Sequence, residues 1–268
     1  MNAFFLIWPM GLVASGALIG FLVGMTGVGA GSVTTSLLIS VFGIPPSAAV
    51  GTDLLFAAVT KSTAAWRFQK YRSIDWTVLS WLAAGSLPGT LLTLLWLHQA
   101  KPDTAVLAQF IRTTLGFILI ASAIANFAFP WLMRKTRQLQ APEPPEPPDV
   151  RHKVLTLVLG SVIGVMVVLT SVGAGAIGMV ALLVLYPTLG VRRLIGTDIV
   201  HAIPLTFVAG LGHLSLGTID LKVLGLLLVG SIPGIAAGVR VTGIAPDWIV
   251  RSALAVVLLV AAVLLLMK

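Results

Sequence analysis

The stretch Thr26-Gly27-Val28-Gly29-Ala30-Gly31-Ser32 places a cluster of glycines between two long runs of apolar residues. A second stretch, Leu169-Thr170-Ser171-Val172-Gly173-Ala174-Gly175, repeats the Val-Gly-Ala-Gly core and again has Thr and Ser beside it. Glycines loosen the backbone, and in hydrocarbon the freed N–H and C=O groups find no water. Such backbone therefore persists only where protein buries it or where it lines a polar cavity. Two matched breaks of this kind indicate the core of a membrane transporter.

The composition is that of a polytopic membrane protein. Hydrophobic residues make up 57% of the 268 residues and charged residues 10%, with a mean hydropathy of +1.04, far outside the range of a soluble domain. The net charge of +8 comes from Lys and Arg in short loops between apolar runs. The positive-inside rule places them there, so we expect the lipid bilayer, and no nucleic acid, as a partner. The chain has no cysteine, which excludes disulfides and thiolate metal sites.

The apolar segments form two sets of five, and the second set repeats the first. Gly51-Thr52-Asp53 recurs 145 positions later as Gly196-Thr197-Asp198, Gly85-Ser86-Leu87-Pro88-Gly89 recurs at the same offset, and the glycine break recurs at 144. A constant offset over most of the chain is a strong sign of internal duplication. The expected segments are 4–25, 33–43, 47–66, 76–97 and 106–131, followed by 153–171, 176–189, 194–213, 221–241 and 247–267.

Loop charges predict that the two repeats have opposite orientations. In the first half the loop after the third segment is basic, with Arg67 and Lys70, whereas in the second half Arg192 and Arg193 precede the third segment. Because Lys and Arg gather on the cytoplasmic side, this swap predicts an inverted repeat with both termini outside. We therefore expect a first transmembrane repeat at 1–131, a cytoplasmic proline-rich linker at 132–152 and a second transmembrane repeat at 153–268.

The second segment of each half is too short for an ordinary span, since about 11 to 14 residues at 1.5 Å each reach only roughly 17 to 21 Å. The predicted fold is therefore all-α, with broken or re-entrant helices at the glycine breaks inside the membrane. Helix N-termini at such breaks commonly face anionic substrates. The N–H groups expected to face the site are those of Gly31, Ser32, Val33, Gly175, Ala176 and Ile177.

The paired breaks, the following Gly51-Thr52-Asp53, the Ser-x-Pro-Gly of the fourth segment and the duplication resemble the sulfite exporter TauE/SafE family of permeases. The resemblance covers nearly the whole chain. It implies a multi-pass protein of the bacterial inner membrane that transports small anions such as sulfite, sulfonates or sulfoacetate, with no cofactor and no ATP hydrolysis. The chain departs from the family pattern in reading Gly-Thr-Asp where members usually have Ala/Gly-Thr-Ser. It also has Thr34-Thr35-Ser36 where members often have a proline.

Ionisable residues inside the apolar segments are candidates for proton coupling, because charge in the bilayer is costly enough to mark function. Asp53 and Asp198 are either helix caps or a matched pair of titrating carboxylates. His201, three residues after Asp198, either shares a proton with it or is a hydrogen-bonded structural histidine. On the proton-coupling hypothesis we expect Asp198→Asn to impair pH-dependent transport more than Asp53→Asn. Lys61 either attracts the substrate anion or extends to the cytoplasmic interface, and we favour the interface.

Hydroxyl groups around the breaks suit the oxygens of a sulfonate, because each donates a hydrogen bond without adding charge. They also suit the alternative role of repairing backbone groups that the glycines free. The predicted substrate-binding set is Thr26, Gly29, Gly31, Ser32, Thr34, Lys61, Thr170, Ser171, Gly173 and Gly175.

Other classes of function lack their signatures in this sequence. It has no His-Glu-x-x-His, nucleophile elbow or phosphate loop, so we expect no enzyme and no metal site. An anion channel and a membrane scaffold subunit remain the alternatives, and a homodimer is left open. The main expectation is a secondary transporter of a small anion.

Overall fold

The computed structural model describes residues 2–26, 31–67, 74–100, 102–139, 149–173, 175–241 and 247–267. Within these ranges the chain is all-α and contains no strand. The helices of the first half are α1 (Asn2–Thr26), α2 (Gly31–Ser40), α3 (Pro46–Arg67), α4 (Trp76–Ala100) and α5 (Thr104–Leu139). Those of the second half are α6 (Val150–Thr170), α7 (Ala176–Leu185), α8 (Val191–Ser215), α9 (Leu221–Val241) and α10 (Asp247–Leu266).

These helices match the ten predicted apolar segments in order. Seven of the described helices are long and apolar enough to cross a membrane, as expected for a polytopic protein. The short second segments are confirmed, because α2 and α7 have 10 residues each, or about 15 Å at 1.5 Å per residue. α3 is long but carries three charged residues, Asp53, Lys61 and Arg67. It therefore brings the buried charges of Asp53 and Lys61 into the bundle.

The largest difference from the predicted segments is at the end of α5, which continues to Leu139, into the range expected for the linker. The sequence from 132 to 139 is rich in Leu, Arg, Lys and Gln, and these residues have high helix propensity even where the apolar pattern has stopped. The proline-rich centre of the linker, at 141–148, lies outside the described residues.

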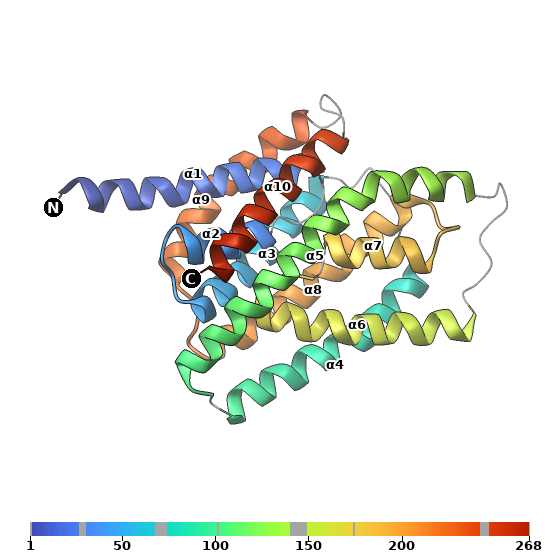
Figure 1. The fold of residues 1–268 in the computed structure, drawn as a ribbon, viewed down its shortest axis with the longest axis horizontal. Helices are drawn as coiled ribbons and strands as arrows, with labels where there is room; N and C mark the ends of the chain where they lie inside the picture. The colour runs from blue at the N-terminus through green and yellow to red at the C-terminus, as the bar shows by residue number, and fades with distance from the viewer. Residues whose placement is uncertain are drawn as a thin grey trace.

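The two halves pack against each other through exchanged pairs of helices. In Figure 1, α1 lies along α9, α6 lies along α4, and α5 and α10 run between these two pairs. Small residues allow the close approach: a methyl group added at Gly20 of α1 would overlap the Ser231 carbonyl of α9. The equivalent Gly164 of α6 meets the Ser86 carbonyl of α4 in the same way. Such small-residue contacts are the usual means of packing helices in membranes.

Polar contacts between the halves are reciprocal as well. The Asp75 backbone N–H donates to Thr197 Oγ1 at 2.9 Å, and the Asp220 N–H donates to Thr52 Oγ1 at 3.0 Å. Each residue of one contact stands 145 positions from its counterpart in the other. Aromatic contacts within each half also correspond. The ring centroids of Trp8 and Phe42 lie 6.2 Å apart in the first half, and those of His152 and Tyr186, 144 positions later, lie 5.8 Å apart in the second.

The direction of equivalent helices bears on the predicted inversion. Gly51, near the start of α3, lies against His213 at the end of α8, while Gly210 of α8 lies against Leu55 of α3. As the residue number rises along α3, the number of the contacting residue on α8 falls. These equivalent helices therefore run antiparallel. This arrangement supports an inverted repeat. The orientation of the repeats in a membrane stays a prediction.

The hydrophobic core has two parts, one built mainly from α1, α2, α5, α9 and α10 and the other mainly from α4, α6, α7 and α8. α3 contributes to both, because Phe56 packs in the first part and Leu54 in the second. Asp53 therefore lies on a helix that runs between the two parts of the apolar core.

Candidate functional site

Asp53 is the centre of the candidate site. Its side chain is completely buried, and its Oδ2 accepts hydrogen bonds from Thr35 Oγ1 at 2.6 Å and from Ser171 Oγ at 2.8 Å. Thr35 belongs to α2, which begins after the first break, and Ser171 ends α6 at the second break. A Cβ at Gly31 would lie 3.3 Å from the same Oδ2. One carboxylate is thus held by residues of both breaks, an arrangement called the Asp53 clasp below.

The second break has backbone that only a few residue types tolerate. Ser171 has φ 59°, and Gly173 and Gly175 have φ 135° and 155°, all in the left-handed region that favours glycine. Thr170 Oγ1 donates to the Met166 carbonyl at 2.7 Å and accepts from the Val172 N–H at 3.3 Å. The Thr170 hydroxyl therefore repairs the backbone, whereas the neighbouring Ser171 hydroxyl binds a carboxylate.

Asp198 repeats Asp53 in position but has different neighbours. Its Oδ1 lies 3.2 Å from where a Cβ of Gly178, on α7, would stand. Oδ1 of Asp198 and Oδ1 of Asp53 are both buried, and neither accepts a hydrogen bond from the described residues. Buried acceptors without partners are uncommon in native proteins, and each calls for an explanation in function or strain.

Lys61 supplies positive charge to the same region. Its side chain is buried, with 7% of its surface exposed, and it is close enough to Asp53 and Asp198 to interact electrostatically with both. The interpretation in which Lys61 extends to the membrane interface is therefore wrong, because the bundle covers its ammonium group. At the equivalent position of the second half, the Thr206 hydroxyl donates to the Ala202 carbonyl at 2.8 Å. The site thus has two carboxylates and one cation.

His201 is buried beside this group but has another partner. Its Nε2 and Ser86 Oγ are 2.7 Å apart, which ties α8 to α4. The structure has no hydrogen bond between His201 and Asp198, both of which it describes, so the expected shared proton is not observed. The structural alternative agrees better with the geometry. Ser86 comes from the Gly-Ser-x-Pro-Gly motif, whose serine thus has a specific role.

Other predicted binding residues lie on α2 and at the start of α7. Thr34 is a buried residue of α2, Gly31 and Ser32 begin the same helix, and Gly175 caps α7. Gly29 and the side chain of Thr26 lie outside the described residues. Thr35 was not predicted as a site residue. The only available signal was its place in the hydroxyl-rich run that follows the first break.

Within the described residues, no group of three or more His, Asp or Glu side chains could hold a metal ion. The candidate site therefore consists of hydroxyl donors, glycine backbone, two carboxylates and one ammonium group. These groups can bind and release an anion, and they can exchange protons. Buried ionisable groups at membrane depth are typical of transport pathways.

A bundle of membrane-spanning helices with two glycine breaks around a buried charged site defines a polytopic membrane transporter. The family model for the sulfite exporter TauE/SafE matches residues 12–265, and the chain belongs to this family. Its family and its apolar helices make it a multi-pass protein of the bacterial plasma membrane.

Two relatives from Bacillus subtilis (strain 168) are similar over most of their length. The probable membrane transporter protein YjnA is 35% identical over 231 residues, which cover 85% of this chain and 87% of YjnA. The probable membrane transporter protein YdhB is 24% identical over 249 residues, or 93% of this chain and 96% of YdhB. No solved structure matched the chain.

Proposed function

We propose that the chain is a secondary transporter of small sulfur-containing or organic anions, in the class of sulfite, sulfonates and sulfoacetate, and that transport is coupled to protons. The family name supports sulfite-like substrates. The observation that carries the proposal is the Asp53 clasp, in which Thr35 and Ser171 donate hydrogen bonds to one carboxylate oxygen. Hydroxyls from both breaks are thus already arranged to bind an anionic oxygen.

In this proposal the Asp53 carboxylate occupies the donors that a substrate would use. When Asp53 is ionised, it holds the hydroxyls of Thr35 and Ser171 and repels an incoming anion. Two like charges about 5 Å apart repel by about 3 kcal/mol at an effective dielectric of about 20. When Asp53 is protonated this repulsion disappears, and the two hydroxyls can turn to a sulfite or sulfonate oxygen. Anion binding and proton binding therefore favour each other.

Lys61 completes the charge balance of the proposed cycle. With Asp53 and Asp198 both ionised, the three charges sum to one negative charge, which disfavours an anion. With both protonated, the ammonium group alone remains charged, and the substrate anion becomes its counter-ion. Burial strengthens this effect, because charges that are removed from water interact through a lower dielectric.

The test is sulfite uptake into proteoliposomes with and without an imposed pH gradient. We expect the parent to respond to the gradient and Asp53→Asn to lose most of the response, because Asn cannot load a proton. The larger expected effect of Asp198→Asn depended on a proton shared between Asp198 and His201. Because His201 hydrogen-bonds Ser86 instead, we expect Asp53→Asn to have the larger effect. Asp103→Asn is the matched control, because Asp103 caps α5 through the Ala105 N–H at an exposed site.

Three outcomes contradict the proposal. If Asp53→Asn/Asp198→Asn responds to the gradient as the parent does, the carboxylates do not couple protons to transport. If uptake fails to saturate with sulfite concentration, the protein behaves as a channel. A scaffold subunit would show no anion flux at all.

A further inference from the structure

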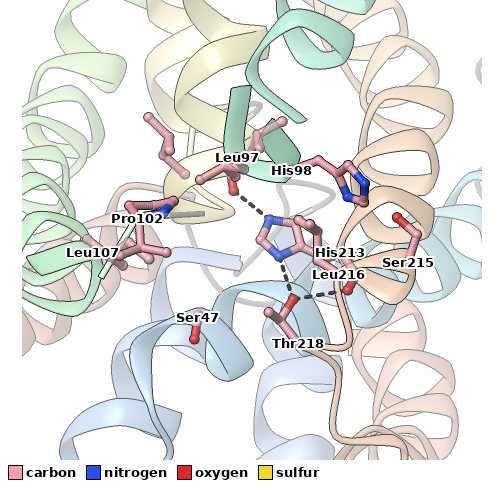
Figure 2. Close-up of a pocket in the computed structure, with 12 residues that line it drawn as sticks. Ser47, Leu97, His98, Pro102, Leu107, His213, Ser215, Leu216 and Thr218 are labelled. Carbon is pink, nitrogen blue, oxygen red and sulfur yellow. Dashed lines mark hydrogen bonds between the residues drawn. The ribbon is translucent and has the colours of Figure 1, made fainter. Parts of the chain in front are cut away.

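A cavity of about 340 Å³ lies among the ends of five helices, and its lining does not include Asp53, Thr35 or Ser171. Figure 2 shows His213 in the middle of its lining, with Ser47 below it and His98 and Pro102 on either side. These residues lie at the start of α3, at the ends of α4 and α8 and just before α5. In the predicted topology all these ends face outward, and we call this space the outer cavity.

His213 links the outer cavity to the second break. Its Nε2 lies 2.9 Å from the Val168 carbonyl oxygen, and its Nδ1 lies 2.8 Å from Thr218 Oγ1. The carbonyl of Val168 lies in the last turn of α6, where the helix leaves carbonyls without backbone partners. The imidazole therefore satisfies one of the groups freed by the break. Val168 lines the cavity, and three residues later Ser171 binds Asp53.

A second connection runs through the start of α3. A Cβ at Gly51 would lie 3.1 Å from His213 Cβ and 2.9 Å from the Thr218 carbonyl oxygen. The glycine of the Gly-Thr-Asp motif is therefore required for α3 to approach the cavity wall. Asp53 follows two residues later on the same helix. The outer cavity thus adjoins the clasp through α3 and through the end of α6.

The lining indicates the kind of ligand. It is largely apolar, with Leu97, Leu107 and Ile111 among its residues, and the described residues that line it include no carboxylate. The hydroxyls of Ser215 and Thr218 already have partners, since Ser215 Oγ donates to the Gly212 carbonyl and Thr218 Oγ1 lies 2.8 Å from His213 Nδ1. Ser47 and His98 carry the remaining polar groups that an oxyanion could contact. An apolar wall with a few polar groups is typical of sites for small organic molecules.

We propose that the outer cavity is a binding site for the organic part and the head group of a short-chain sulfonate on its way to the Asp53 clasp. This inference rests on the proposed function and deepens it by selecting organosulfonates over sulfite. A water molecule occupies about 30 Å³ of liquid, so the cavity has room for roughly ten. Sulfite, with four non-hydrogen atoms, leaves most of it unfilled, whereas an alkyl chain covers the leucine side chains.

The test uses the full chain in lipid nanodiscs with methane-, ethane-, propane- and butanesulfonate as probes and sulfite as reference. Ligand-dependent thermal stabilisation gives an affinity for each probe. We expect the Kd to fall about fourfold with each added methylene, the factor that corresponds to ~0.8 kcal/mol per buried CH2. Neutral butanesulfonamide should bind at least tenfold more weakly than butanesulfonate. Equal binding of the two would contradict an anion site.

Variants locate the binding. Leu107→Trp fills the cavity and should abolish the dependence of the Kd on the chain length of the sulfonate. If Leu107→Trp folds poorly, Ser47→Leu is the second variant, and it should reduce the same dependence. Leu91→Trp is the matched control, because Leu91 lies on α4 with 51% of its surface exposed. His98→Gln should weaken all the sulfonates by about two- to tenfold, as expected for the loss of one polar contact.

The outcomes separate this inference from the proposed function. If sulfonates are transported but Leu107→Trp and Ser47→Leu both keep the parent dependence on chain length, the outer cavity is not the site and the transporter proposal stands. If sulfite and sulfonates are neither bound nor transported by the parent protein, the proposed function is wrong, and the inference falls with it.

Discussion

Replacing Ser171 tests whether the Asp53 clasp is part of the substrate site. Its hydroxyl lies 2.8 Å from Asp53 Oδ2, a distance typical of an O–H···O hydrogen bond. In the proposed cycle the same hydroxyl donates to the anion after Asp53 takes up a proton. A hydrogen bond to a charged partner contributes about 1.5–3 kcal/mol. Ser171→Ala should therefore raise the KM for sulfite by roughly 10- to 150-fold.

The assay is the initial rate of sulfite uptake into proteoliposomes over a range of concentrations. Ser36→Ala is the matched control, because Ser36 is a buried hydroxyl on α2 that donates to the carbonyls of Ser32 and Val33 and should leave the KM near the parent value. Ser171 also has φ 59°, so Ser171→Gly removes the hydroxyl while relieving the backbone. Both Ser171 variants should raise the KM alike.

Two results would refute this reasoning. If Ser171→Ala and Ser36→Ala change the KM by the same amount, the clasp has no special role in binding. If Ser171→Gly keeps the parent KM while Ser171→Ala raises it, substrate binding depends on the backbone conformation of the break and not on the hydroxyl.

Two further predictions concern topology and packing. The chain has no cysteine, so Gln140→Cys should react with a membrane-impermeant maleimide only after cells are permeabilised, and reaction in intact cells would overturn the inverted-repeat model. Gly164→Ala should destabilise the protein by about 1–3 kcal/mol in thermal unfolding, because its methyl group would overlap the Ser86 carbonyl. Gly225→Ala, with open space around the added Cβ, is the control, and an equal loss of stability there would show that helix packing is not the cause.

The number and order of the helices could be predicted from the sequence, because membrane-spanning segments are recognised by their length and hydropathy. The short second segments predicted α2 and α7. The offset of 145 identified Thr52 and Thr197 as equivalent residues, and only the structure shows that they accept reciprocal hydrogen bonds. The end of α5 at Leu139 could not be predicted from hydropathy. Hydropathy marks where hydrocarbon stops, whereas a helix ends where propensity and capping change.

The candidate site was predicted in part. Asp53, Gly31 and Ser171 were all predicted as site residues. That Ser171 donates to Asp53 was not predicted, because the two residues are 118 positions apart and no local pattern pairs them. Of the two alternatives left open for His201, the structure agrees with the hydrogen-bonded structural histidine. Spacing on one helix placed it beside Asp198, but a neighbouring helix offered Ser86 at 2.7 Å.

The sequence by itself determined the class of protein, the number and order of the apolar segments, the duplication and the places where the backbone breaks. These features depend on composition and on residues close together in the chain. Tertiary structure alone decided which hydroxyl binds Asp53, that Lys61 is covered by the bundle, and that His213 satisfies the Val168 carbonyl. Each of these depends on which helix faces a given side chain across the bundle, and that choice is made by packing among all ten helices.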